Sequence, residues 1–145
     1  MRTRLLLALS AVALVTLLAL AGSASAGGRP LSTDLSGVEE VPPADPDGTG
    51  FAHISLNSGT GEVCWSITAS DITLPATAAH IHEAPAGVNG GVVVTLSPPD
   101  ESGMASGCTI ADTALVKDIR KNPAEYYVNV HTTDYPGGAI RGQLG

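Results

Sequence analysis

The stretch FAHISLNSGTGEVCWSITA, residues 51–69, predicts two β-strands joined by a tight turn. Apolar side chains occupy every second position on both sides of the turn, at Ala52, Ile54, Leu56, Val63, Trp65 and Ile67. Because side chains on a strand alternate between the two faces of a sheet, this spacing places all of them on one face. Residues 57–61, Asn-Ser-Gly-Thr-Gly, are typical turn formers. We therefore expect an antiparallel hairpin with one buried face.

The remainder of the chain continues this pattern of short strands. Further strands are predicted over residues 31–41, 78–84, 91–96, 126–132 and 139–144, and residues 42–48 are predicted as a Pro-rich loop and turn. Only residues 113–121 have helical spacing, with Asp112 as the N-cap and Pro123 after the end. The sequence thus predicts an all-β domain, a Greek-key β-sandwich or barrel of about seven to eight strands with one short helix.

The N-terminal segment has the pattern of a secretory signal peptide. Arg2 and Arg4 precede a predominantly apolar run at residues 5–21, and Ala24 and Ala26 provide the small residues that signal peptidase requires. The alternative is an uncleaved anchor, but the run lies at the lower limit of what spans a bilayer and small residues follow it instead of charges. We expect residues 1–26 to be a signal peptide cleaved near Ala26. The domain of residues 27–145 would then be secreted, with no stable membrane span.

The charge of the chain narrows the possible partners. The whole sequence has 7 Lys and Arg against 14 Asp and Glu, a net charge of −7, and removal of Arg2 and Arg4 lowers it to −9 for residues 27–145. Nucleic acids and anionic membranes require a basic surface, so neither is an expected partner. An acidic surface is compatible with metal ions or basic partners, and it also keeps an exported protein soluble.

Two cysteines, Cys64 and Cys108, are present in the domain. An even number of cysteines in an oxidising compartment predicts a disulfide between them. Paired thiolate metal ligands are the alternative, but these two residues lack the short Cys-x-x-Cys spacing that is common in such sites.

Several stretches, taken together, resemble the CHRD domain, a module named after chordin that also occurs in secreted bacterial proteins. They are LSGVEEVPP at 35–43, GEVCW at 61–65, AHIHEA at 79–84, GGVVV at 90–94, YVNVHT at 127–132 and PGGAIRGQL at 136–144. The resemblance covers residues 31–145 in order. It implies an extracellular β domain that acts as a non-catalytic binding or structural module, and its partner would be an extracellular protein.

The four histidines of the chain all fall in predicted strands: His53, His80, His82 and His131. His80 and His82 are two residues apart, so both point to the same face of their strand. If the strands 78–84 and 126–132 are neighbours, His131 would join them in a patch on the outer face of one sheet. Imidazoles at this spacing suit copper or zinc, and His53 would be a fourth candidate ligand. The alternative is that these side chains are simply polar residues on a solvated strand face.

A second resemblance bears on the same histidines. The His-x-His strand and the Gly-rich loop after it resemble the first copper-ligand strand of Cu,Zn superoxide dismutase. His131, followed by Gly137-Gly138 and Arg141, is similar to the last copper-ligand strand of that enzyme and its anion-steering arginine. This chain has four histidines where the complete two-metal site uses six, and it has no second cluster for zinc. The resemblance implies copper binding and raises dismutase activity as an alternative. No hydrolase or nucleotide-binding motif is present. The resemblance to the CHRD domain keeps a non-catalytic module as the favoured prediction.

Overall fold

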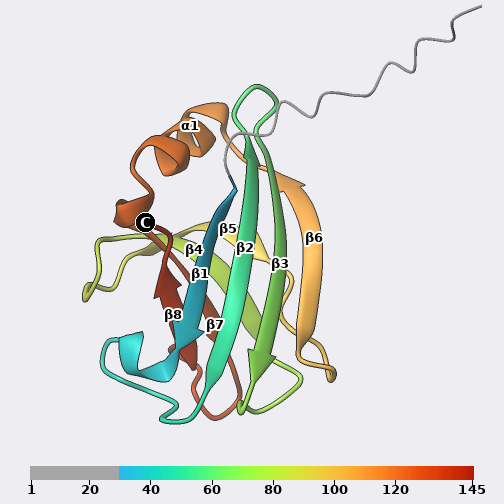
Figure 1. Cartoon of the computed structure of the whole chain (residues 1–145), viewed down its shortest axis with the longest axis vertical. Coiled ribbons are helices and arrows are strands. Elements are labelled where there is room, and N and C mark those ends of the chain that lie inside the picture. The colour runs from blue at the N-terminus through green and yellow to red at the C-terminus, as the bar shows by residue number, and fades with distance from the viewer. Residues whose placement is uncertain (1–29) are drawn as a thin grey trace, which may run out of the picture.

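The computed structural model describes residues 30–145 (Figure 1). The predicted signal peptide at residues 1–26 lies outside the described residues. The eight strands are β1 (Leu31–Ser36), β2 (Thr49–Asn57), β3 (Glu62–Ser70), β4 (Ala78–Glu83), β5 (Gly91–Leu96), β6 (Met104–Ile110), β7 (Tyr126–His131) and β8 (Ile140–Gln143). One α-helix, α1 (Thr113–Lys121), and two short 3₁₀ helices, η1 (Gly37–Glu39) and η2 (Pro123–Glu125), complete the fold. None of the helices in residues 30–145 is long and apolar enough to cross a membrane.

All eight strands form one antiparallel sheet in the order β5-β4-β7-β8-β1-β2-β3-β6. After β6, the chain returns through α1 to pair β7 with β4, which is a Greek-key connection. The two edge strands approach each other where Ser97, just after β5, donates a 3.4 Å hydrogen bond to the carbonyl of Ser106 in β6. The sheet is therefore a nearly closed barrel (Figure 1), and the all-β prediction is confirmed.

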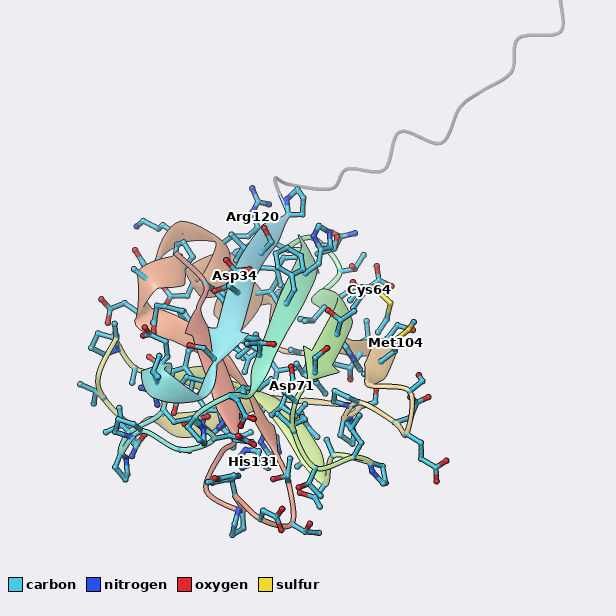
Figure 2. All side chains as sticks on the ribbon, turned by 60° about the horizontal axis from the view of Figure 1, so that its bottom comes forward. Asp34, Cys64, Asp71, Met104, Arg120 and His131 are labelled. Carbon is cyan, nitrogen blue, oxygen red and sulfur yellow. A yellow bond between two sulfur atoms is a disulfide. The ribbon has the colours of Figure 1, made fainter. Side chains whose placement is uncertain are left out.

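The predicted hairpin is the β2–β3 pair. Its register places Ile54 opposite Trp65 and Ala52 opposite Ile67, and all four side chains are buried in the barrel core. On the outer face, Cys64 lies opposite Cys108 of β6, and their sulfur atoms are bonded (Figure 2), as the sequence predicted. The disulfide thus ties β6 to the rest of the sheet.

Strand β6 was not predicted from the sequence, and its composition explains why. Its inward-facing positions hold Ala105, Gly107 and Thr109, which do not form an apolar stripe. A Cβ on Gly107 would lie 2.7 Å from a ring carbon of Trp65, so the indole occupies the space that a side chain of β6 would fill. The apolar core next to β6 is therefore formed by Trp65 of the neighbouring strand β3.

The first strand was predicted too long. A strand was expected over residues 31–41, whereas β1 ends at Ser36 and η1 follows. Gly37 packs so closely on the backbone of Asp45 that a Cβ would lie 1.7 Å from its carbonyl oxygen. This contact turns the chain out of the sheet.

Helix α1 forms as predicted and covers one end of the barrel (Figure 1). The Asp112 carboxylate accepts hydrogen bonds from the backbone N–H groups of Ala114 and Leu115, which caps the first turn. Val116 and Ile119 are fully buried against the core.

Candidate metal centre

Strands β4 and β7 are neighbours, which was the condition for the histidines to meet. His80 pairs with Asn129, His82 with Tyr127 and Ala78 with His131 across this ladder. Since paired positions share a face, all three imidazoles project from the same outer side of the barrel. We call His80, His82 and His131 the histidine cluster. His131 lies at the end of the barrel opposite Arg120 of α1 (Figure 2).

The cluster brings one nitrogen of each ring within reach of a common point. The three candidate ligand atoms all lie within 4.8 Å of one another. The Nδ1 of His80 and the Nε2 of His131 are 3.1 Å apart. Two nitrogens bound to one tetrahedral zinc at ~2.0–2.1 Å are separated by roughly 3.3 Å. This pair is therefore already spaced for a shared metal ion, and the third nitrogen lies within 4.8 Å of both.

Backbone carbonyls orient two of the rings. His82 Nδ1 lies 2.9 Å from the carbonyl oxygen of Gly90, and His131 Nδ1 lies 3.0 Å from that of Pro136. Because a carbonyl only accepts hydrogen bonds, both Nδ1 atoms carry the proton and neither Nε2 does. The Nε2 of His131 therefore accepts a hydrogen bond from the Nδ1–H of His80, and a shared metal ion would replace this bond once the His80 proton has moved to Nε2. Metal-ligating histidines are commonly held in this way, with the second ring nitrogen donating to a carbonyl.

The Nε2 atom of His82 is buried and has no hydrogen-bond partner in the described structure. His82 is only 8% exposed, so the alternative of a polar side chain on a solvated strand face does not hold for this residue. His80 and His131 are half-buried. A buried polar atom without a hydrogen-bond partner lowers the stability of the folded state by about 1–3 kcal/mol. The Nε2 of His82 therefore lacks a partner that its burial would require.

Burial also favours the neutral, metal-binding form of two of the rings. It lowers the pKa of His80 and of His131 below the usual value of 6.5, and neighbouring imidazoles lower both further. The hydrogen bond to Pro136 partly opposes the shift for His131. At neutral pH these side chains are uncharged and able to donate a lone pair.

The sequence model of the CHRD domain matches residues 31–144. The chain belongs to the CHRD domain family. No match was found among curated proteins or among solved structures. Membership of the CHRD family supports a non-catalytic binding module in general. It does not specify the ligand of this CHRD domain.

His53 lies apart from the cluster of this CHRD domain. It is on β2, where it pairs with Ser32 and Ser66, and strands β7, β8 and β1 separate β2 from β4 in the sheet. The sequence could place His53 on an outward face, but it could not show which part of the barrel that face belongs to. His53 is therefore not a ligand candidate for the same ion.

Arg141 is not available to steer anions in the way that the dismutase resemblance implies. Its side chain is 2% exposed, and its two terminal nitrogens donate 3.0 Å hydrogen bonds to Asn89 Oδ1 and to the carbonyl of Val88. The guanidinium also lies 4.1 Å above the ring of Tyr127, whose other neighbour is the stacked His82 imidazole at 4.8 Å. Arg141 thus packs against Tyr127 beside the cluster and bonds residues 88 and 89.

Glu40 completes this buried polar region and was not singled out by the sequence. Its carboxylate is 3.9 Å from Arg141, and a Cβ on Gly138 would lie 2.4 Å from its Oε1. Burial raises the pKa of Glu40 to about 7, and the charge of Arg141 opposes this rise only in part. Glu40 stands in a Pro-rich segment without periodic spacing, so no pattern could have indicated its position.

Proposed function

We propose that this CHRD domain is an exported binding module whose ligand is a copper or zinc ion held by the histidine cluster. The ligand atoms are Nδ1 of His80 and Nε2 of both His82 and His131. The N-terminal signal-peptide pattern supports export, and the family supports a binding module in general.

The observation that carries this proposal is the buried, unpaired Nε2 of His82 beside two further imidazole nitrogens. A solvated polar patch would not leave such an atom without a partner, since buried nitrogens are almost always hydrogen-bonded. A metal ion at the cluster would satisfy it.

The ligand chemistry selects the class of metal. All three candidate donors of the histidine cluster are imidazole nitrogens, which suit zinc and copper, whereas magnesium and calcium prefer oxygen ligands. Three protein ligands also leave a fourth tetrahedral position for water or another ligand.

Binding is favoured over dismutase catalysis because of Arg141. Its guanidinium is already bonded to Asn89 and Val88 beneath the surface, so it presents no free charge to an approaching anion. The enzymatic alternative therefore lacks one of the features that suggested it, the anion-steering arginine.

Calorimetric titration with Zn(II) and Cu(II) at pH 7.5 tests the proposal. The protein is purified after export, and mass spectrometry is expected to give Gly27 as its first residue. We expect one ion per chain, a loss of affinity of about 100-fold or more in His82→Gln, and unchanged affinity in the control His53→Gln. Weak, non-stoichiometric binding, or an equal loss in both variants, would contradict a site at the cluster.

A further inference from the structure

The loop of residues 84–90 joins β4 to β5 beside the histidine cluster. It starts directly after the His82-Glu83 pair and ends at Gly90, whose carbonyl accepts the His82 Nδ1–H. We refer to residues 84–90 as the 84–90 loop. The orientation of His82 therefore depends on how firmly this loop is held.

Gln143 of β8 holds the first residue of the loop through a 2.9 Å hydrogen bond to the carbonyl of Ala84, and two further side chains hold its last three residues. The Tyr127 hydroxyl of β7 accepts a 3.2 Å hydrogen bond from the N–H of Gly90, the same residue that fixes His82. Arg141 of β8 donates to Val88 and to Asn89, and Asn89 in turn donates a 2.7 Å bond to the carbonyl of Val41. The loop is thus fastened at its last three residues from two directions.

The same two side chains also support the imidazole directly. The Tyr127 ring is stacked on His82 with an angle of 6° between the planes, and the Arg141 guanidinium lies 4.1 Å from the centre of the Tyr127 ring. Such a cation–π contact in a buried setting adds to the rigidity of the stack. Ring position and tautomer of His82 are therefore both set by Tyr127 and Arg141.

Gly90 has to be a glycine for this arrangement. A Cβ at this position would lie 2.0 Å from the carbonyl oxygen of Glu83, so a side chain would push the loop away from β4. The close approach brings the Gly90 carbonyl to His82.

We infer that Tyr127 and Arg141 are positioning residues for the metal site, which hold the 84–90 loop so that His82 keeps its proton on Nδ1 and presents Nε2. This inference rests on the proposed function, because the positioning role serves the proposed metal site. The Nδ1–H tautomer of His82 can nevertheless be measured in the metal-free protein. A residue that supports only the fold would not select between the two ring nitrogens.

The experiment measures the His82 tautomer by long-range ¹H–¹⁵N NMR of the metal-free protein at pH 8, and then Zn(II) affinity by titration. Tyr127→Phe removes the acceptor for Gly90 and keeps the stacked ring. Asn89→Ala, at an exposed position, removes the side-chain acceptor of Arg141 and avoids the folding defect that loss of a buried arginine would bring. Tyr126→Phe is the matched control, because its hydroxyl on the same strand bonds Asp118 instead of the loop.

We expect wild-type protein and Tyr126→Phe to hold His82 as the Nδ1–H tautomer, and both test variants to show a mixture with about tenfold weaker zinc binding. An unchanged tautomer in both test variants would overturn the inference, even if wild-type protein binds zinc. If wild-type protein binds no zinc but the tautomer responds, the proposed function fails while the positioning role of Tyr127 and Arg141 stands.

Discussion

Replacing Glu40 by Gln is expected to stabilise the domain at alkaline pH. The Glu40 side chain is 5% exposed, and burial raises its pKa from 4.5 to about 7 despite the Arg141 guanidinium at 3.9 Å. The folded state therefore holds the Glu40 proton more tightly than the unfolded state does. This contribution is fully present below pH 4.5 and is lost as the pH rises through about 7. Glutamine cannot ionise and keeps the neutral form at every pH.

The difference between these pKa values sets the size of the effect. At 1.36 kcal/mol per pKa unit it corresponds to about 3 kcal/mol. Relaxation of the structure around the charged carboxylate reduces this penalty, so we expect about 2 kcal/mol in favour of Glu40→Gln at pH 8 and a difference close to zero at pH 4.5. A change of about 2 kcal/mol shifts a urea midpoint by roughly 1 M for a domain of this size.

Urea denaturation of both proteins at pH 4.5, 6 and 8 checks this expectation. Subtracting the variant curve from the wild-type curve removes the contributions of the histidines, which are common to both. Glu39→Gln, at the exposed neighbouring position, serves as the control and should leave the difference flat. If Glu40→Gln is less stable than wild type at pH 8, the attraction to Arg141 outweighs the burial of Glu40 and our reasoning is refuted.

Three further predictions concern the disulfide, the Trp65 pocket and the pH dependence of metal binding. The double variant Cys64→Ser/Cys108→Ser should lose about 3–4 kcal/mol of unfolding free energy, because the bond closes a separation of 44 residues, and a loss below about 1 kcal/mol in denaturation would contradict this. Gly107→Ala should cost about 1–3 kcal/mol through overpacking against Trp65, whereas Gly91→Ala, where a Cβ meets open space, should be nearly neutral in thermal melts. Zinc affinity of the histidine cluster should fall as the pH drops below ~6.5, and burial displaces this fall to lower pH because it lowers the pKa of His80 and His131. An affinity that is flat from pH 7.5 to 5 would argue against imidazole ligands.

Much of the fold follows from local patterns in the sequence. The alternation around residues 51–69 predicted the β2–β3 hairpin, and the Asp112 cap predicted α1. β6 could not be predicted because its inward face is formed by small residues that accommodate Trp65 from the adjacent strand. The hydrophobic pattern of one strand does not show which side chains of the neighbouring strand fill the core beside it.

The candidate site was predictable in part for the same reason. The His-x-His spacing placed His80 and His82 on one face, and His131 joined them once β7 was known to pair with β4. The burial of His82 depends on the 84–90 loop and on Arg141, which is distant in sequence, so no local pattern could indicate it. For His53, the pattern predicted the outward face correctly but not its separation from the cluster.

The location of a bound ion tests the central claim most directly. Crystals grown with one equivalent of Zn(II) or Cu(II) would be measured at the absorption edge of the metal to obtain an anomalous difference map. We predict one strong peak at roughly 2.0–2.1 Å from His80 Nδ1, His82 Nε2 and His131 Nε2. A peak at another part of the domain, or no peak at stoichiometric metal, would contradict the assignment of the histidine cluster as a metal site.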